Sequence, residues 1–250
     1  MRMPAMVRRS PSLSGMWTNR RSASILIGSF SSLITTTRHG TVWDVPIETV
    51  MLDALDGVQV EADLVRLDDA RGSVVITHPH PLYGGDRFNP VVEALFTALP
   101  RAGFTALRFD FRGVNNSGGS HDGGDSERLD VVGALELLEL VDPDSPIWLV
   151  GYSFGAHVAL NVVDPRLSGW VAVAPPLAAM NTRCLADRDH RPKLLLVPEH
   201  DQFSPPAPTA TFTEGWQSCT QQTVEMADHF LSGHLGVVTR TVCEHLEARS

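Results

Sequence analysis

The chain has 250 residues, 43% of them hydrophobic, and a formal net charge of -9 at pH 7. This length and composition suffice for one sizeable core, so we expect a single folded domain. With 29 acidic and 20 basic side chains, the sequence lacks the basic footprint of a nucleic-acid-binding protein. No apolar stretch reaches the roughly 18 residues that a membrane-spanning helix requires, so we expect no membrane span.

The three cysteines, Cys184, Cys219 and Cys243, are widely spaced and form no C-x-x-C pair. Closely spaced cysteine pairs are typical of zinc sites and redox-active dithiols. We therefore expect reduced or buried thiols in this protein.

The first 43 residues differ in composition from the rest, because they contain six Arg, no Asp or Glu, and many Ser and Thr. Arg20 and Arg21 precede an apolar run at 25–34, which is the order found in export signals. Gly28 and three serines interrupt that run, and no A-x-A cleavage site follows it. We therefore favour a disordered extension over residues 1–43, or translation from an upstream start codon, and expect a cytoplasmic protein.

Residues 45–67 alternate between apolar and polar side chains around Asp56-Gly57, which predicts two antiparallel strands joined by a tight turn. Further along the chain, short apolar runs predict strands and longer amphipathic stretches predict helices. The predicted strands are 73–77, 104–111, 146–150, 169–174, 193–197 and 221–226, and the predicted helices are 88–100, 125–141, 154–163, 206–217 and 234–248. Because strands alternate with helices, we expect residues 44–250 to form an α/β domain with a doubly wound, mostly parallel sheet.

The segment Gly-Tyr-Ser-Phe-Gly places Ser153 between a predicted buried strand and a predicted helix. This is the setting of a nucleophile elbow, a sharp turn that exposes a reactive serine. Glycines on both sides remove side chains that would collide with the neighbouring strand and helix. We therefore predict that Ser153 is a catalytic nucleophile.

A serine hydroxyl needs a histidine to take its proton and an acid to orient that histidine. In a doubly wound sheet these partners should follow later strands, the acid first and the histidine second. Asp201 and His229 fit this order, since Asp201 follows the segment KLLLVPEH and His229 comes after the last predicted strand. Glu199 is the rival acid and His234 the rival base, and we prefer Asp201 and His229 because of their places in the loops.

An oxyanion hole should provide two backbone N–H groups that stabilise the charge developing on the attacked carbonyl. Phe154, the residue after the nucleophile, is the first expected donor. The second should come from the loop that begins His-Pro-His-Pro at residue 78, where the prolines have no N–H. His80 is our first choice, with Leu82 or Tyr83 as alternatives.

The same loop contains a pattern that could bind a metal ion, His78-x-His80 followed by Asp86. A serine triad needs no metal, so we expect no cofactor or metal in this protein. His78 is instead expected to pack and form hydrogen bonds beneath the site.

Five segments, HPHPLYGG, FDFRGVNNSGG, GYSFGAHVAL, PEHDQF and ADHFLSG, together resemble the α/β-hydrolase superfamily, in particular its small, lidless bacterial branch of predicted hydrolases. The resemblance covers about residues 45 to 248. It implies an α/β-hydrolase fold with a minimal lid, and a triad of Ser153, Asp201 and His229. It also implies oxyanion donors at His80 and Phe154.

The loops around the expected site contain further residues that should support it: His78, Tyr83, Gly84, Asp110 and Arg112. Asp110 and Arg112 are expected to form a structural charge pair. The loop that follows them reads Val-Asn-Asn-Ser, where the superfamily often has a glycine before the serine. This departure affects the expected shape of the loop and leaves the triad unchanged.

Acyl transfer to Ser153 followed by water would hydrolyse an ester, thioester or amide. Only 18 residues, 175–192, lie where relatives often insert a lid, which predicts an open site for small or short-acyl ester substrates. The alternatives are a non-catalytic binding protein with the same fold and a serine peptidase.

Overall fold

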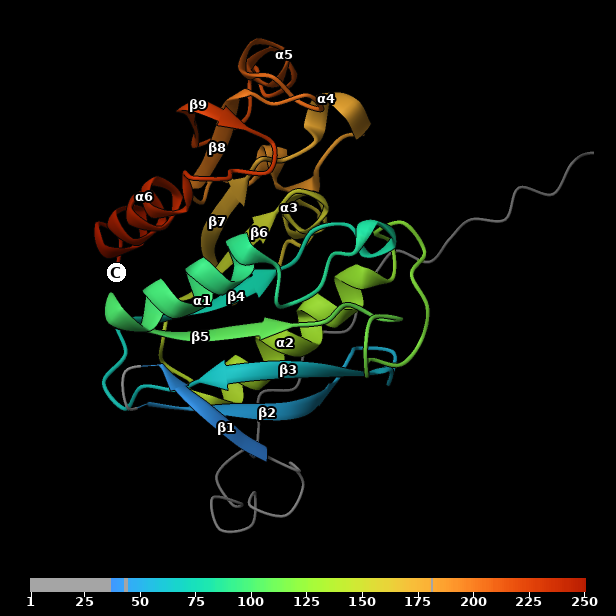
Figure 1. Cartoon of the computed structure of the whole chain (residues 1–250), viewed down its shortest axis with the longest axis vertical. Coiled ribbons are helices and arrows are strands. Elements are labelled where there is room, and N and C mark those ends of the chain that lie inside the picture. Colours follow the sequence, from blue (N-terminus) through green and yellow to red (C-terminus); the bar gives the residue numbers. More distant parts are fainter. Residues whose placement is uncertain (1–36, 43–44, 181) are drawn as a thin grey trace, which may run out of the picture. The chain divides into compact units, whose positions relative to one another are not determined.

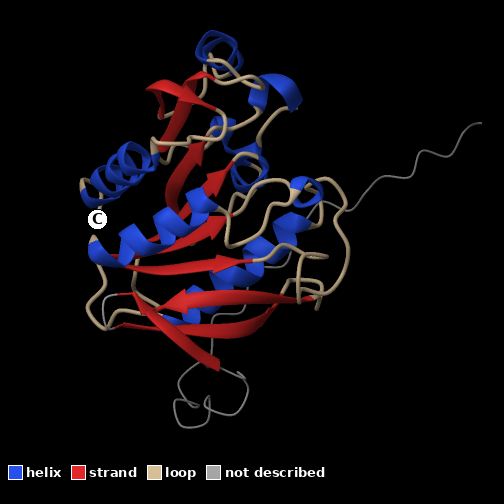
Figure 2. Ribbon diagram, in the orientation of Figure 1, coloured by secondary structure: helices blue, strands red, loops and turns tan. Residues whose placement is uncertain are grey.

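In the computed structural model, the described residues are 37–42, 45–180 and 182–250. They contain a sheet of nine strands with helices on both of its faces (Figure 1; Figure 2). The strands are β1 (Thr37–Val42), β2 (Val45–Asp53), β3 (Gln59–Val65), β4 (Gly72–Thr77), β5 (Phe104–Phe109), β6 (Ile147–Tyr152), β7 (Leu167–Val173), β8 (Lys193–His200) and β9 (Cys219–Asp228). The helices are α1 (Pro90–Arg101), α2 (Glu127–Val141), α3 (Phe154–Leu160), α4 (Leu177–Met180), α5 (Pro206–Phe212) and α6 (Leu235–Glu247).

The strand order is β1-β2-β3-β5-β4-β6-β7-β8-β9. The first three strands and the β3–β5 pair are antiparallel, whereas every pair from β5 to β9 is parallel. The predicted mostly parallel α/β sheet with an N-terminal antiparallel hairpin is therefore confirmed. Because β4, β6, β7 and β8 are parallel neighbours, the loops after them meet at one edge of the sheet.

The hairpin turn forms where the sequence predicts it. Gly57 has φ +82°, a conformation that glycine adopts without strain, and its N–H donates to the carbonyl of Ala54. Strands β2 and β3 pair on either side of this turn, with Asp53 opposite Gln59.

The two faces of the sheet are covered by different helix pairs. Helices α1 and α6 contact each other on one face, and α2 and α3 contact each other on the other (Figure 1). Between these layers lie fully buried large side chains, including Trp148, Trp170, Phe96 and Phe104. This burial supplies the main stabilisation of the domain and fixes the strand ends that carry the site.

Two helices end three or more residues before their predicted ends. Helix α5 ends at Phe212, five residues before the predicted end, because the chain turns at Gly215, which has φ +80°. Helix α3 ends at Leu160, three residues early. Strand β1 lies within the segment that we predicted to be an extension, and the rest of that prediction falls outside the described residues.

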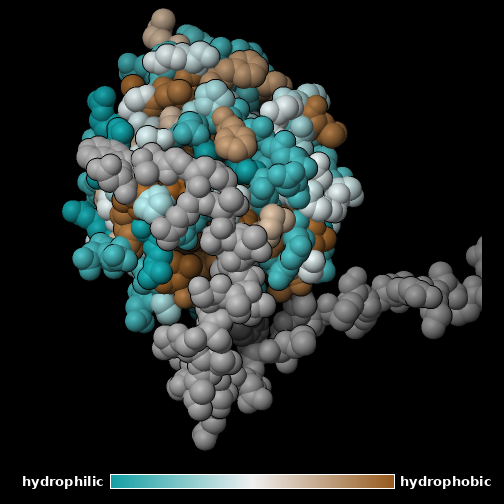
Figure 3. All heavy atoms as spheres, turned by 60° about the horizontal axis from the view of Figure 1, so that its bottom comes forward, coloured by the Kyte–Doolittle hydropathy of each residue, from teal (hydrophilic) through white to brown (hydrophobic). Residues whose placement is uncertain are grey.

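The described part of the β7–β8 connection contains the one-turn helix α4 and a 3-10 turn at Leu185–Arg188. This is a minimal insertion at the position of a lid, as predicted. On the face seen in Figure 3, hydrophobic side chains form separate small areas among hydrophilic ones. Among the described residues, no helix is long and apolar enough to span a membrane.

Candidate active site

Ser153 lies at a sharp turn between β6 and α3. Its backbone has φ 54° and ψ -119°, a conformation that non-glycine residues rarely adopt. A Cβ added to Gly155 would lie 2.5 Å from the carbonyl oxygen of His78, and one added to Gly151 would lie 2.6 Å from the backbone of Ala156. The two glycines therefore let the turn pack against β4 and α3, and the partly exposed Ser153 side chain lies at the sheet edge.

A continuous hydrogen-bonded chain joins the three residues that the sequence singles out. Ser153 Oγ lies 2.9 Å from His229 Nε2, and His229 Nδ1 lies 2.8 Å from Asp201 Oδ2. An ionised carboxylate can only accept, so Nδ1 carries the proton and Nε2 is left to accept the serine proton. This arrangement brings together side chains that lie 76 residues apart in the sequence.

Asp201 is buried and held by its own loop. Its Oδ1 accepts backbone N–H groups from Phe203 at 2.8 Å and Ser204 at 2.9 Å, which leaves Oδ2 for His229. The rival acid, Glu199, is exposed and accepts the backbone N–H of Met226 at 2.7 Å. Of the two candidates, the structure brings Asp201 to the histidine.

His229 directly follows β9 and is 5% exposed. The buried Tyr152 donates its hydroxyl to the backbone carbonyl of His229 at 3.0 Å, which anchors this loop to the end of β6. Burial raises the pKa of Tyr152, so this hydroxyl stays protonated and remains a donor. The rival base, His234, lies at the start of α6 and its Nδ1 contacts the Ser232 carbonyl at 2.9 Å.

The loop after β4 contains a 3-10 turn, Pro81–Tyr83, that uses most of its own N–H groups. Leu82 N–H donates to Nδ1 of His80 at 3.2 Å, and Tyr83 N–H donates to the His80 carbonyl at 3.1 Å. Both alternatives to His80 as an oxyanion donor are therefore engaged within the turn. Phe154 begins α3, and a helix leaves its first N–H groups without an intrahelical partner.

Gly84 ends this turn with φ 77°, and Tyr83 is 87% exposed beside it. The ring of Tyr83 lies 4.8 Å, centroid to centroid, from that of His80. Gly84 thus supports the loop through its backbone, whereas Tyr83 contributes an exposed side chain near the site.

His78 is fully buried and both of its ring nitrogens are used. Nδ1 lies 2.6 Å from the Pro79 carbonyl, and Nε2 accepts the Phe111 N–H at 3.0 Å. Burial lowers the pKa of His78 to about 4, so the ring is neutral at pH 7. It ties the end of β4 to the end of β5 and has no nitrogen free to bind a metal.

The prediction that Asp110 and Arg112 pair with each other is wrong. Asp110 binds the backbone N–H and the guanidinium of Arg87, whereas Arg112 binds Asp130 of α2 at 2.7 Å and Asp56 of the hairpin turn at 3.0 Å. The two side chains therefore have different partners, Arg87 in the loop before α1 for Asp110, and α2 and the hairpin turn for Arg112. Each still supports a site loop, but through a different partner.

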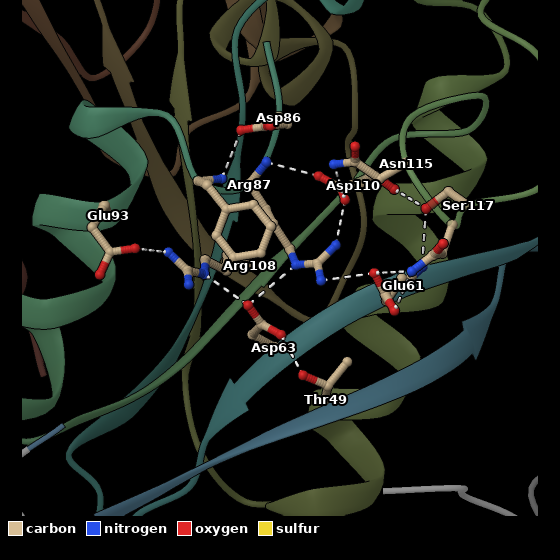
Figure 4. A network of polar contacts seen from close by, with 12 residues as sticks. Thr49, Glu61, Asp63, Asp86, Arg87, Glu93, Arg108, Asp110, Asn115 and Ser117 are labelled. Carbon is tan, nitrogen blue, oxygen red and sulfur yellow. Dashed lines mark hydrogen bonds and ion pairs between the residues drawn. The ribbon is translucent and has the colours of Figure 1, made fainter. Parts of the chain in front are cut away.

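Asp110 belongs to a buried network that the sequence did not reveal (Figure 4). Arg87 contacts Glu61 at 2.7 Å, Asp63 at 3.1 Å, and Asp110, and Asp63 also accepts from Arg108 at 3.1 Å. Burial alone would lower the pKa of Arg87, but the three carboxylates raise it, so the guanidinium remains charged. Burial raises the pKa of Asp110.

This network fastens the loop that contains His80. Arg87 at the end of the loop binds Asp110, and His78 at its start binds the N–H of the next residue, Phe111. Both ends of the loop are therefore attached to consecutive residues after β5, which limits how far His80 can move.

Two surface cavities lie away from Ser153. One of about 550 Å³ is lined by residues of the segments around Arg188 and Trp216, and the other, of about 650 Å³, lies between α1 and α6. Among the described residues, no cluster of three or more His, Cys, Asp or Glu side chains could hold a metal ion.

Comparison with known proteins agrees with the observed fold. Residues 74–243 match the sequence model of the alpha/beta hydrolase family. Over 106 residues the chain is 39% identical to an uncharacterized protein of Rickettsia prowazekii (strain Madrid E), an alignment that covers 41% of this chain and only 44% of that protein.

Solved structures extend the likeness to most of the chain. An alpha-beta serine hydrolase homologue from Coxiella burnetii is 29% identical, with a TM-score of 0.71, and the match covers 80% of this chain and 97% of that one. A Xanthomonas campestris protein, described as a serine hydrolase without a lid, is also 29% identical, with a TM-score of 0.68 and coverage of 80% and 92%. Because the family model spans well over half of its length, this chain belongs to the alpha/beta hydrolase family.

Proposed function

We propose that the protein is a serine hydrolase that cleaves ester bonds, or related thioester or amide bonds, through an acyl-enzyme intermediate on Ser153. The observation that carries this proposal is the hydrogen-bonded chain from Ser153 Oγ through His229 to the buried Asp201. Such a chain gives a serine hydroxyl the base that it needs to become a nucleophile.

In the first step, Ser153 Oγ attacks the substrate carbonyl carbon while its proton moves to His229 Nε2. Asp201 then faces an imidazolium, whose positive charge its carboxylate stabilises across the 2.8 Å contact. The carbonyl oxygen becomes negatively charged, and the backbone N–H groups of His80 and Phe154 stabilise that charge. When the C–O bond breaks, His229 returns the proton to the departing alcohol oxygen.

In the second step, water replaces the alcohol. His229 takes a proton from the water, whose oxygen attacks the acyl carbon on Ser153, and the proton then returns to Ser153 Oγ as the acid departs. Every proton transfer runs through His229 Nε2, so the mechanism requires no metal or organic cofactor. We propose a small-molecule ester-type substrate as its partner.

The minimal β7–β8 insertion leaves the site open, which favours short-acyl or exposed esters over long-chain lipids. A series of p-nitrophenyl esters of increasing acyl length tests this point. We expect kcat/KM to be highest for the short chains. A rise with chain length, together with activation at a lipid–water interface, would contradict it.

The direct test of the proposal is labelling with a fluorophosphonate, followed by intact-mass analysis. We expect one adduct on the wild type, mapped to Ser153, and none on Ser153→Ala. His229→Ala should react far more slowly, while the matched control His234→Ala should react like the wild type. A folded wild-type protein that forms no adduct would contradict the proposal and favour a binding protein.

A further inference from the structure

The loops that supply the proposed site residues also present large exposed apolar side chains. Phe203 is 50% exposed and lies two residues after Asp201, and Phe230 is 61% exposed and directly follows His229. Other exposed apolar residues, such as Leu55 and Leu140, belong to the hairpin turn and to α2. Single exposed apolar residues are ordinary, so the significant feature is the grouping of Phe203 and Phe230 around one histidine.

Phe203 and Phe230, which we call the His229 rim, both contact that imidazole. The ring centroids of Phe203 and His229 lie 4.6 Å apart, and those of Phe230 and His229 lie 5.8 Å apart, both in edge-to-face geometry. Their backbones are also held: Phe203 N–H donates to Asp201 Oδ1, and Phe230 N–H donates to Asp228 Oδ1 at 3.1 Å. The rim therefore has its backbone fixed before any substrate binds, which lowers the entropic cost of a contact.

The mechanism determines which half of an ester meets this rim. His229 gives its proton to the departing alcohol oxygen, so that oxygen must lie within hydrogen-bond distance of Nε2. The carbonyl oxygen lies on the opposite side, toward His80 and Phe154, where the proposed oxyanion donors are. The alcohol half of the substrate, rather than the acyl half, therefore lies beside Phe203 and Phe230.

We propose that this site selects esters whose alcohol half is uncharged and apolar, with an aromatic ring as the best match. This inference rests on the proposed function. Rings that are half exposed in the free protein lose water contact when an apolar alcohol covers them, whereas a polar alcohol would lose its own hydration there. Changes in the His229 rim should therefore alter the selectivity for the alcohol half.

The test compares two acetate esters, benzyl acetate and 2-methoxyethyl acetate, with each enzymatic rate divided by the rate of alkaline hydrolysis. Both esters form the same acetyl-enzyme, so selectivity for the alcohol appears in kcat/KM. We expect the wild type to favour benzyl acetate by about tenfold, and the double variant Phe203→Ala/Phe230→Ala to lose most of that preference. The double variant Phe203→Leu/Phe230→Leu, which keeps apolar side chains, should retain an intermediate preference.

Leu140→Ala is the matched control, because it removes an exposed apolar side chain far along α2 and should leave the preference unchanged. Equal kcat/KM for the two esters, or an unchanged preference in the alanine double variant, would overturn the inference. Fluorophosphonate labelling separates the two proposals. A wild type that labels at Ser153 but shows no preference contradicts this inference alone, whereas a wild type that neither labels nor hydrolyses contradicts the proposed function as well.

Discussion

Two polar clusters near the carboxyl ends of the strands, the Arg87 network and the Ser153–His229–Asp201 triad, differ in whether every polar group finds its partner inside the protein. In the network around Arg87, every carboxylate meets a cation or a donor inside the protein (Figure 4). In the chain from Asp201 to Ser153, the last group is a partly exposed hydroxyl whose only side-chain partner among the described residues is His229. The Arg87 network, whose groups are all paired within the protein, stabilises the fold. The triad ends in an accessible hydroxyl and can therefore exchange a proton with a substrate.

We therefore predict that the hydrogen-bonded triad determines the rate of hydrolysis, whereas the Arg87 network determines the stability of the fold. Buried ion pairs gain little net stability when intact, but breaking one leaves an uncompensated buried charge. A catalytic chain shows the opposite behaviour, because its removal costs transition-state stabilisation and few folded-state contacts. The following changes separate the two roles.

The largest expected effect is that of Asp201→Asn on rate. An asparagine keeps an acceptor for Phe203 N–H, but its NH2 group would face His229 Nδ1 and force the proton onto Nε2. The histidine could then no longer accept the serine proton, so we expect kcat to fall by about a thousand- to ten-thousandfold. Ester hydrolysis kinetics measure this, with Glu199→Gln as the matched control. A loss of less than about tenfold would mean that Asp201 does not orient the base.

The next largest effect is that of Arg87→Met on stability. This change leaves Glu61, Asp63 and Asp110 without their shared cation, and we expect it to lower the free energy of unfolding by about 3–5 kcal/mol. Urea unfolding measures this, with Arg128→Met as the control. Arg128 forms a surface pair with Asp125, so its loss should cost less than about 1 kcal/mol. Equal effects of the two changes would contradict this account of the Arg87 network.

The buried His78 should make stability depend on pH. Its pKa is about 4 in the folded chain, whereas an unfolded histidine titrates near 6.5. At pH values between these two, the His78 imidazole is protonated in the unfolded chain and neutral in the folded chain. The free energy of unfolding should therefore fall as the pH is lowered from 6.5 to 4, by about 3 kcal/mol from this residue.

Urea unfolding at several pH values tests this expectation in His78→Gln, which keeps an acceptor for Phe111 N–H. Burial also lowers the pKa of His245 to about 4, so the variant is compared directly with the wild type. We expect the free energy of unfolding to depend less on pH in His78→Gln than in the wild type. The exposed control His190→Gln should show the same pH dependence as the wild type. An unaltered pH dependence in His78→Gln would show that this imidazole is not buried neutral.

The smallest effect concerns the backbone of the nucleophile turn. In Gly155→Ala the new methyl group would lie 2.5 Å from the His78 carbonyl oxygen, which we expect to cost about 2 kcal/mol and to displace Ser153. Gly236→Ala is the matched control, because nothing lies within 4 Å of a Cβ at that position in α6. It should stabilise the protein by roughly 0.5–1 kcal/mol. Thermal unfolding and fluorophosphonate labelling rates check both expectations.

The sequence predicted the strands from β2 to β9, their mostly parallel arrangement and the loops that bear the site, because these follow from local patterns, but it missed β1. Ser153 is marked by flanking glycines, and Asp201 and His229 by their places after strands. The structure brings these three side chains into one hydrogen-bonded chain. Chain order alone sufficed to nominate them, since parallel strands deliver their loops to one edge.

The Arg87 network and the His229 rim could not be found in the same way. Glu61 and Asp63 lie two residues apart on β3, whereas Arg87 and Asp110 lie in two other loops, and no spacing rule joins these three segments. For this reason the expected Asp110–Arg112 pair, chosen from residues that are near in sequence, was wrong. The exposure of Phe203 and Phe230 likewise depends on how their loops fold, whereas an aromatic residue in a sequence is more often buried.

The most direct test of the central claim is to trap the acyl-enzyme. The protein is mixed with p-nitrophenyl acetate, quenched with acid within the first turnover, and analysed by intact mass and peptide mapping. We predict one acetyl group on Ser153, absent in Ser153→Ala. Undiminished hydrolysis by Ser153→Ala, or acetyl groups on other residues that persist in Ser153→Ala, would contradict it.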